Sequence, residues 1–274
     1  MTNFYRLLNI AIQKSLIFFY ERINKGVFFN FYLGILKITN LFKSNLKISK
    51  NVIFEYDKSF FLSRKSRFYM YSKGLNNRLE FLFNEYLLKH IRFNHNDLII
   101  DCGANIGELG FYLNHKFKIK NVLSIEPDKH EYETLKLNSK YSNYSPLNYA
   151  LYNKNGYIDF YLNNESADSS IFAQDNLMSI SVKTITLNEL FKKQNIKKCK
   201  LLKLEAEGAE PEILEGGLEV LKYIEYISVD CGPERGIKNE ITVPLVSKII
   251  YKSNFSLIDA GGVRKILLFK NNLF

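Results

Sequence analysis

The sequence predicts an α/β fold with a mostly parallel central sheet and helices on both of its faces. From residue 97 onward, short apolar runs typical of strands alternate with longer segments whose apolar residues recur at helical spacing. This alternation requires crossover connections, which give parallel strands covered by helices. The chain has 274 residues, 46% hydrophobic and 24% charged, which suits one such domain plus an extension.

The elements of this region follow from the same pattern. Strands are expected at residues 97–101, 121–126, 145–150, 157–162, 179–184, 199–205, 225–231, 255–259 and 265–270. Helices are expected at residues 107–115, 129–140, 187–194, 210–222 and 240–253. Residues 157–184 interrupt the alternation as a strand-rich insertion.

Residues 1–60 are expected to form a basic, aromatic-rich extension with helical structure. Apolar residues of 4–23 recur at three- and four-residue steps, as in a helix. Residues 1–100 carry 16 Lys+Arg and 6 Asp+Glu, so the whole net charge of +10 lies there. The extension is either a helical cap, docked on the main domain or on a second subunit, or a segment that lies on an anionic membrane surface. Residues 61–96 are expected to lead into the main domain. A strand is expected at 52–62, at the boundary with the extension, and a helix at 76–92.

The location predicted for the protein is cytoplasmic, with attachment to the inner face of the membrane if the extension binds lipid. Gln13 and Lys14 interrupt the first apolar run, which argues against a secretory signal. No run reaches the roughly 18 apolar residues of a spanning helix. Cys102, Cys199 and Cys231 have no metal-ligand spacing and are expected to be buried, reduced thiols.

The stretch LIIDCGANIGELG, residues 98–110, predicts a ligand site at the end of the first strand. In a nicotinamide fingerprint, G-x-G-x-x-G, the second glycine lets a pyrophosphate approach the backbone. Asn105 stands at that position, between Gly103 and Gly107, and its side chain obstructs a pyrophosphate. S-adenosylmethionine (SAM) has no pyrophosphate, and Asp101 is placed to attract its cationic end. The glycine-rich backbone and Asn105 can hydrogen-bond its amino-acid part.

A second acid supports this interpretation. Glu126 ends the next expected strand, where a carboxylate can accept hydrogen bonds from ribose hydroxyls. Pro127 stops that strand, and Asp128 can cap the following helix. The alternative for both Asp101 and Glu126 is ordinary turn and cap chemistry.

Four blocks resemble the FkbM-type methyltransferases, a family of SAM-dependent enzymes with a class I, Rossmann-like fold. They are DCGANIGE (101–108), IEP (125–127), ADSSIF (167–172) and LLKLEAEGAEPEILEGG (201–217). The resemblance covers roughly residues 64–236 and implies a seven-stranded, mostly parallel sheet, with SAM as methyl donor and a hydroxyl as acceptor. It also implies a methyltransferase domain at residues 97–274.

The resemblance implies roles for individual residues. The residues that would bind the cofactor are Asp101, Gly103, Asn105, Gly107, Glu126, Pro127, Ala150 and Ser169, with Ala150 near the adenine at the third strand's end. Lys203, Glu205, Glu207 and Glu210 would face or support the reaction site. The family usually has Asp at the position of Glu205, whose longer side chain reaches a different point, so the role of Glu205 as base or metal ligand does not carry over directly.

Methyl transfer to a hydroxyl needs alignment of the reactants and a base. Glu205 is the first candidate base and Glu207 the second, while Lys203 orients a carboxylate or holds an anionic acceptor. Alternatively, Glu207 and Glu210 cap the helix that follows them. These three glutamates could also bind Mg²⁺. No nearby His or paired Asp supports such a site, so we expect no metal.

The predicted function is SAM-dependent O-methyl transfer to a hydroxyl, most plausibly of a sugar in a glycan or glycoconjugate. The rivals are a catalytically silent methyltransferase fold that serves as a membrane or assembly partner, and a nicotinamide-dependent oxidoreductase, which Asn105 disfavours. Nucleic acid is not an expected partner, although residues 63–74 are basic and aromatic. An N-P-P-Y-type tetrapeptide, common in base N-methylation, is absent after the fourth strand, where EAEG stands.

Overall fold

A computed structural model describes most of the chain after residue 45. The described residues are 46–49, 52–55, 58–64, 67, 70–71, 73–142, 144–162, 170–172, 178–236, 238–261 and 264–274. The helix expected at residues 4–23, and with it most of the 1–60 extension, lies outside them. The chain divides into two compact units, Met1–Arg78 and Leu79–Phe274.

The first unit contains a small antiparallel sheet, β1 (Leu46–Ser49), β2 (Val52–Glu55) and β3 (Lys58–Phe61), in that order. The strand expected at 52–62 is therefore two paired strands. Ile53 and Phe60 are buried, and the ring of Phe60 lies 6.1 Å from that of Tyr71. Helix α3 (Leu75–Glu85) begins in this unit and ends in the second.

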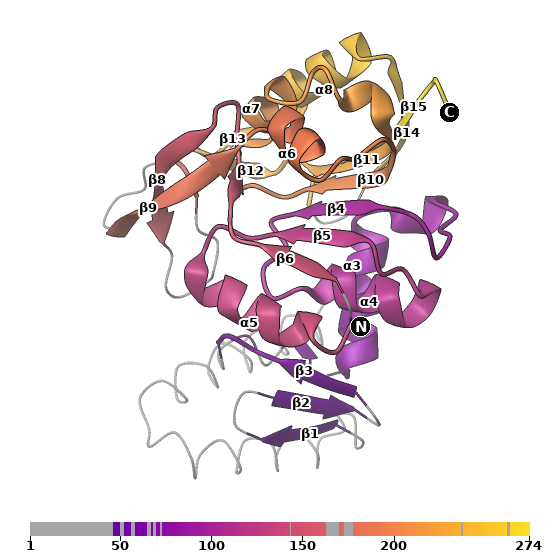
Figure 1. The fold of residues 1–274 in the computed structure, drawn as a ribbon, viewed down its shortest axis with the longest axis vertical. Coiled ribbons are helices and arrows are strands. Elements are labelled where there is room, and N and C mark those ends of the chain that lie inside the picture. Colours follow the sequence, from indigo (N-terminus) through magenta and orange to yellow (C-terminus); the bar gives the residue numbers. More distant parts are fainter. Residues whose placement is uncertain are drawn as a thin grey trace, which may run out of the picture. The chain divides into compact units, whose positions relative to one another are not determined.

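The second unit is built on a seven-stranded sheet (Figure 1). Its strands are β4 (Ile99–Cys102), β5 (Val122–Ile125), β6 (Ser145–Leu147), β10 (Cys199–Leu204), β11 (Ile224–Asp230), β14 (Phe255–Gly261) and β15 (Ile266–Asn271). Their order is β14-β15-β11-β10-β4-β5-β6, in which β15 runs antiparallel to β11 and β14 to β15, and the other neighbours are parallel. This confirms the predicted seven-stranded, mostly parallel sheet. The order reverses at β4, whose neighbours are β5 and β10.

The helix expected at 76–92 was too long: α3 ends at Glu85, and Leu87 has a left-handed φ of 59° that a helix does not allow. The helices after residue 97 follow the strands as predicted, with one difference in length. They are α4 (Glu108–Phe117), α5 (Lys129–Ser139), α6 (Leu187–Lys193), α7 (Glu210–Glu215) and α8 (Val243–Lys252), with single 3₁₀ turns η2 (Leu88–His90) and η3 (Leu221–Tyr223). Asp128 caps α5 by accepting from the His130 amide, as expected. The helix expected at 210–222 was too long. α7 ends at Glu215, and Gly216 and Gly217, which are poor helix formers, follow it.

The predicted insertion forms a separate sheet of β7 (Ala150–Leu151), β8 (Gly156–Leu162) and β9 (Met178–Ile185), in the order β7-β9-β8. A short pair, β12 (Pro233–Arg235) and β13 (Glu240–Ile241), follows β11. The prediction that the strand starting at residue 145 runs to residue 150 was wrong. β6 stops at Leu147, and Ala150 pairs with Thr184 of β9 instead of ending the third strand of the main sheet.

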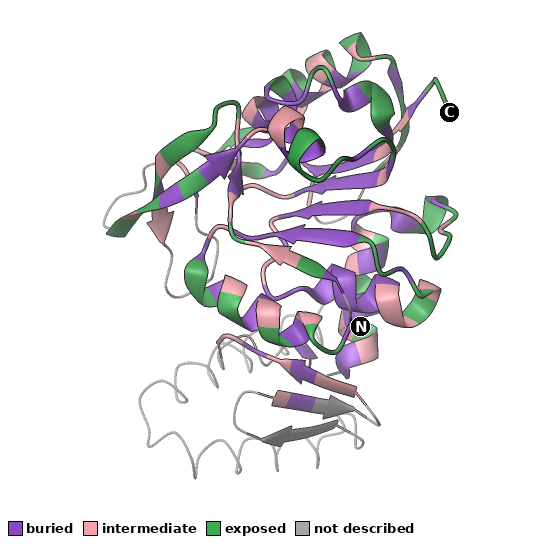
Figure 2. Ribbon diagram, in the orientation of Figure 1, coloured by how far each residue is buried: buried purple, intermediate pink, exposed green. Residues whose placement is uncertain are grey.

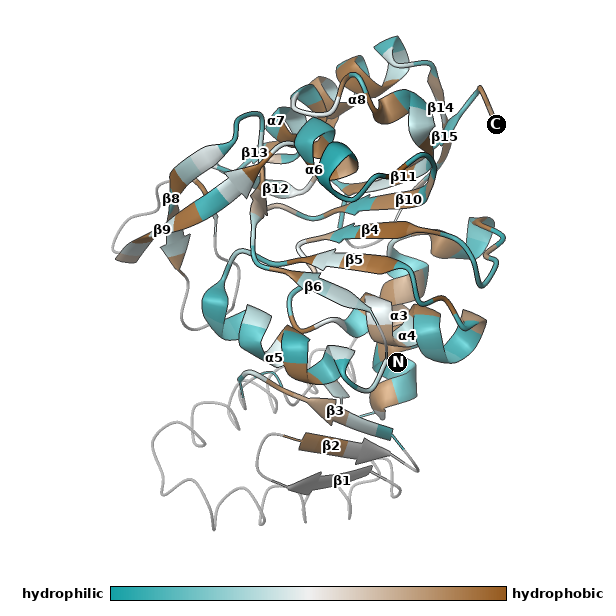
Figure 3. Ribbon diagram, in the orientation of Figure 1, coloured by the Kyte–Doolittle hydropathy of each residue, from teal (hydrophilic) through white to brown (hydrophobic). Residues whose placement is uncertain are grey.

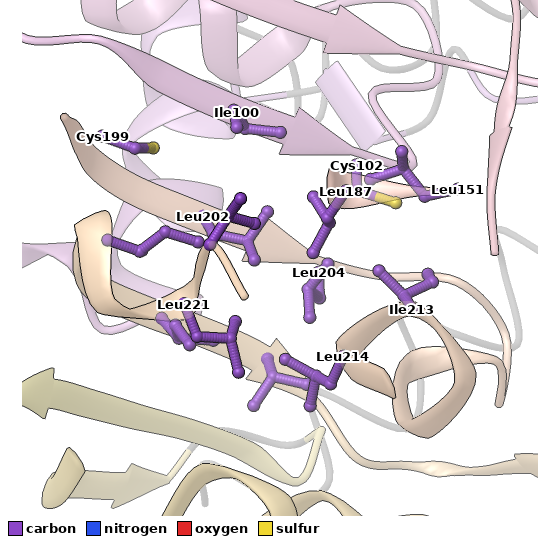
Figure 4. Close-up of a cluster of buried hydrophobic side chains, with 14 of the residues drawn as sticks. Ile100, Cys102, Leu151, Leu187, Cys199, Leu202, Leu204, Ile213, Leu214 and Leu221 are labelled. Carbon is purple, nitrogen blue, oxygen red and sulfur yellow. The ribbon is translucent and has the colours of Figure 1, made fainter. Parts of the chain in front are cut away.

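The main core lies on one face of the sheet, between the strands and α6, α7 and α8. Alternate strand residues point into it, including Ile100 of β4 and Leu202 and Leu204 of β10. Figure 4 shows Leu204 pointing toward Ile213 and Leu214 of α7. The central strands are buried along their length in Figure 2 and mostly hydrophobic in Figure 3. The intervening strand residues point to the opposite face, and near the carboxyl ends many are polar. Among the described residues, no helix is long and apolar enough to cross a membrane.

We predict that Leu202→Ala lowers the free energy of unfolding by roughly 2–5 kcal/mol, because it leaves a cavity in the centre of the core. Leu202 is fully buried. The matched control is Leu257→Ala on the edge strand β14, whose side chain is 42% exposed and whose loss should change stability by at most about 0.5 kcal/mol. Urea denaturation measures both, and equal effects would contradict this placement of the core.

Candidate active site

A row of polar side chains crosses the four central strands near their carboxyl ends. The strand register places Ser124, Asp101, Lys203 and Ser228 side by side, and all four are buried. Because strand neighbours in register share a face, this row lies on the face opposite the main core. A second set stands two residues further along the chain, at the strand ends: Asp230 is the last residue of β11, while Glu126, Gly103 and Glu205 directly follow β5, β4 and β10. We call the second set the edge row.

The turn after β4 is held in a left-handed backbone conformation. Gly103, Asn105 and Gly107 have φ values of 70°, 50° and 90°. A Cβ on Gly103 would lie 1.9 Å from the Glu205 carbonyl oxygen, and one on Gly107 would lie 2.1 Å from the Tyr144 hydroxyl. The two glycines are therefore required by the packing of the turn against β10 and Tyr144, and Asn tolerates the positive φ between them.

The amide groups of this turn donate within the protein. Those of Gly103 and Ala104 donate to Ile125 O, and that of Gly107 donates to Ala104 O. The amides of Asn105 and Ile106 donate to Glu126 Oε2, at 2.8 Å, and to Asn105 Oδ1, at 3.0 Å. A phosphate-binding turn instead aims its amides at the ligand. This turn offers carboxylate and carbonyl acceptors, which suit a cationic group.

Glu126 connects the turn to the end of β5. Its Oε2 accepts from the Asn105 amide and its Oε1 accepts from the Asp128 amide at 2.9 Å. Burial raises the pKa of Glu126 to about 8, although these two amides act in the opposite direction. Each oxygen keeps acceptor capacity for a hydroxyl of a ligand.

Asp101 and Lys203 form a buried ion pair between β4 and β10. Lys203 Nζ lies 3.1 Å from Asp101 Oδ1 and also donates to Gly103 O at 2.8 Å. Burial lowers the pKa of Lys203, but the Asp101 carboxylate offsets this, so the pKa lies above its ordinary value. Within the described part of the chain, no group donates a directed hydrogen bond to either Asp101 oxygen. A buried carboxylate in this state favours a ligand that brings a donor or a positive charge.

Glu205 is held by three donors. Lys203 Nζ lies 3.0 Å from its Oε2, which also accepts from the Tyr86 hydroxyl, and Arg264 pairs with Oε1. Lys203 further lies 5.0 Å from the centroid of the Tyr86 ring. One ammonium thus joins Asp101 of β4 to Glu205 of β10, so Lys203 orients carboxylates, one of the two roles expected for it.

Asp230 ends the edge row and is fully buried. Its Oδ1 accepts from the Gly232 amide at 2.9 Å, and Arg264 Nη1 lies 3.5 Å from Oδ2. No hydrogen-bond donor to Oδ2 exists among the residues that the structure describes. Burial raises the pKa of Asp230 above its ordinary value.

Glu210 holds the turn before α7. Its Oε1 accepts from the amides of Ala206, at 2.8 Å, and Gly208, at 3.3 Å. The expected capping of the helix by Glu207 or Glu210 was wrong, because Ala209 is the N-cap and no side chain caps α7. Burial raises the pKa of Glu210 to about 7. Glu207 lies in the same turn with φ of 50°, and its carbonyl oxygen accepts from Ser170 Oγ at 3.0 Å.

The remaining predicted site residues are spread around this edge. Pro127 follows Glu126 and is half-buried, and Ala150 is buried in the small sheet. Ser169 lies outside the described residues. In the described part of the chain, no three His, Cys, Asp or Glu side chains are grouped as metal ligands.

Tyr86 and Arg264 were not predicted as site residues. Tyr86 follows α3 and reads in the sequence as part of its packing stripe, and only the structure shows that its hydroxyl bonds Glu205. Arg264 comes from the connection between β14 and β15, 59 positions after Glu205, and nothing in its local sequence indicates the contact. A buried tyrosine does need a partner for its hydroxyl, which is the one available signal.

Comparisons with known proteins give a family match to part of the chain. Residues 101–231 match the family model described as "Methyltransferase FkbM domain". The chain is 28% identical over 136 residues to hexuronic acid methyltransferase AglP of Haloferax volcanii. The aligned region covers 49% of this chain and 55% of AglP.

Solved structures were compared as well. A methyltransferase FkbM from Methylobacillus flagellatus KT matches with a TM-score of 0.45 at 14% identity, over 75% of this chain and 54% of that one. Magnesium protoporphyrin IX methyltransferase from Synechocystis PCC 6803, with bound SAM, matches with a TM-score of 0.43 at 11% identity, over 72% and 79% of the two chains. The match therefore spans about half the length of AglP and of the M. flagellatus protein.

Lys203→Met should lower the free energy of unfolding by roughly 3–5 kcal/mol, because it leaves the buried Asp101 carboxylate without its cation and removes one of the two cations that pair with Glu205. The matched control is Lys198→Met just before β10. Lys198 is 63% exposed and 3.8 Å from Glu225, so its loss should cost at most about 1 kcal/mol. Chemical denaturation at neutral pH compares them. A loss no larger in K203M than in K198M would show that the Asp101–Lys203–Glu205 contacts are absent.

The raised pKa of Glu126 predicts a pH dependence of stability. With a folded-state pKa of about 8 and an unfolded value near 4.5, folding takes up a proton between these limits. The protonated Glu126 therefore contributes its full stability below the unfolded-state pKa of 4.5. This contribution is lost as the pH rises through the folded-state pKa of about 8. Wild type should lose stability relative to Glu126→Gln, by about 1 kcal/mol or more, when pH is raised from 5 to 8.5. Parallel pH dependences, measured by urea denaturation, would contradict this.

Proposed function

Starting from the FkbM-type methyltransferase domain that residues 101–231 form, we propose that this protein transfers a methyl group from SAM to a hydroxyl of a sugar in a glycan or glycoconjugate. The observation that carries the proposal is the edge row, in which Glu126 and Gly103 lie beside two acidic residues, Glu205 and Asp230. One end of the row suits a nucleoside and a cationic group, and the other suits a hydroxylated acceptor.

SAM is the cofactor of the domain, and the residues at β4 and β5 fit it. Asp101 presents a buried carboxylate without a directed donor, which suits a cationic ligand. Glu126 keeps acceptor capacity for ribose hydroxyls, and the turn around Asn105 retains carbonyl acceptors for an ammonium group. When bound, SAM supplies an electrophilic methyl group on a sulfonium. Pro127, Ala150 and Ser169 are proposed to line the same site.

The chain's own residues act by positioning. Lys203 holds the Asp101 carboxylate on the cofactor side and the Glu205 carboxylate on the acceptor side, at 3.1 and 3.0 Å. The Tyr86 hydroxyl and Arg264 fix Glu205 further. Such fixed partners keep two bound reactants in one relative orientation, which is the main contribution that a methyltransferase makes to the rate. Glu207, in the turn after β10, is proposed to face the acceptor.

A sugar is the acceptor class that we favour over other hydroxyl compounds. Carboxylates and a partly exposed guanidinium lie together at the acceptor end of the edge row, and such groups bind vicinal hydroxyls well. AglP, the relative at 28% identity, is named for methylation of a hexuronic acid. We propose a cytoplasmic location, with residues 1–60 at an anionic membrane surface if the acceptor is lipid-linked.

The proposal predicts SAM-dependent methylation of sugar hydroxyls. Wild-type protein, supplied with [methyl-¹⁴C]SAM and a panel of nucleotide sugars, uronic acids and lipid-linked glycans, should label at least one of them. Asp101→Asn should weaken SAM binding roughly 10- to 100-fold, because it removes the charge that faces the cationic ligand. The control is Asp159→Asn, an exposed position in β8. Label recovered only in non-sugar compounds would overturn the sugar assignment.

A further inference from the structure

We infer that the Asp230 carboxylate removes the proton from the acceptor hydroxyl. The inference rests on the proposed methyl transfer and adds to it the identity of the base. Glu205, the first candidate base because of its place at a strand end, is then a positioning residue.

Glu205 is poorly suited to accept a proton. Its two oxygens face the Lys203 ammonium and the Arg264 guanidinium, and Oε2 also accepts from the Tyr86 hydroxyl. Opposite charges and hydrogen bonds to the ionised form both stabilise a carboxylate and weaken it as a base. Protonation of Glu205 would also leave the buried Lys203 ammonium and the partly exposed Arg264 guanidinium without this counter-charge.

Asp230 has the opposite surroundings. One oxygen is used by the Gly232 amide, while Oδ2 accepts no hydrogen bond from any described residue. The Arg264 contact to Oδ2, at 3.5 Å, is an ion pair without hydrogen-bond geometry. A buried carboxylate oxygen in this state is stabilised by an arriving hydroxyl donor.

The strand register brings Asp230 to the acceptor end of the site. Leu204 pairs with Val229, so Asp230 lies beside Glu205, and Gly103 lies on the other side of Glu205. The edge row therefore runs from Glu126, where a ribose fits, to Asp230, three strands away. The Arg264 side chain is 39% exposed and holds Oδ2 only by a 3.5 Å ion-pair contact, so an acceptor hydroxyl can reach Oδ2 beside it while Arg264 stays paired with Glu205.

The surroundings of Asp230 raise its pKa above the ordinary value for aspartate. Burial is the largest influence and raises its pKa, the Gly232 amide and Lys203 lower it, and Glu85 raises it. The charged or titratable groups that face Asp230 come from several elements. They are Glu85 of α3, Tyr86 after it, Lys203 of β10, Glu210 of α7, Cys231 after β11, Glu234 of β12, and Arg264. A base works best with a pKa raised toward the working pH.

The proton and electron balance of the step is simple. The O–H bond of the acceptor breaks and its proton moves to Asp230 Oδ2. The electron pair left on oxygen forms the new O–CH₃ bond. The C–S bond of SAM breaks, and its pair stays on sulfur to give the neutral thioether of S-adenosylhomocysteine. A buried anion and a sulfonium cation are thus both neutralised, and Asp230 afterwards returns the proton to solvent.

The test compares Asp230→Asn with two other variants. Asn keeps an Oδ1 acceptor for the Gly232 amide, so the turn after β11 should persist. Asp259→Asn is the matched control, because Asp259 pairs with His90 at the exposed surface. Glu205→Gln tests the rival base. Transfer from [methyl-¹⁴C]SAM to methyl β-D-glucopyranoside and to methyl β-D-glucopyranosiduronate is measured between pH 5.5 and 9.5, and SAM affinity by calorimetry.

We expect D230N to bind SAM as wild type does and to transfer methyl roughly 100-fold more slowly or worse. The rise of the wild-type rate with pH, on the acid side, should vanish in D230N and persist in D259N, E205Q and the conservative Asp230→Glu. Wild-type rates in D230N, or loss of the acid limb in E205Q alone, would overturn the inference.

Failure of the proposed function is distinguishable from failure of this inference. If wild type methylates neither glycoside nor any sugar of the larger panel, the sugar proposal falls. Asp230 is then tested by its own titration, from the infrared carboxyl difference between wild type and D230N. A pKa above the ordinary aspartate value supports its role as a base, and an ordinary or lower one overturns it.

Discussion

The buried ammonium of Lys203 is the contact on which the rest of the site depends. It lies within 3.1 Å of Asp101 and 3.0 Å of Glu205, and it bonds the carbonyl oxygen of Gly103 at 2.8 Å. β4 and β10 are neighbours because the strand order reverses at β4. A crossover therefore separates the two carboxylates by about a hundred residues in sequence and places them side by side in space. Without the cation, Asp101 would be a buried carboxylate without its ion-pair partner, and the partly exposed Glu205 would keep only Arg264.

The turn after β4 explains why Asn stands where a dinucleotide-binding protein has glycine. All five amides from Gly103 to Gly107 donate within the protein, so none is available to a pyrophosphate. What remains at this edge is a set of oxygen acceptors, with Asp101 and Glu126 foremost. This chemistry selects a cationic, hydroxyl-bearing ligand, and SAM is both. Asn105 itself satisfies the Ile106 amide and tolerates the positive φ.

Much of the fold and the cofactor side could be predicted from the sequence, because both depend on local patterns. Strand and helix periodicity, the glycine-bearing turn and Glu126 at the next strand end are readable in short windows. The acceptor end of the edge row depends on how the strands pair and on chain segments that are far apart in the sequence. Tyr86 and Arg264 reach Glu205 from 119 and 59 positions away, which no local pattern reports. The local pattern also predicted a helix that runs past Glu215, where α7 ends, and placed Ala150 in the main sheet instead of the small one.

The measurement that tests this account most directly is a calorimetric titration of the protein with SAM, S-adenosylhomocysteine and NADH. An edge that offers acceptors and no available turn amides should bind SAM, and should bind S-adenosylhomocysteine through the shared ammonium and ribose. It should give no heat with NADH, whose pyrophosphate finds no donors. Tight NADH binding, or no SAM binding by folded protein, would contradict it.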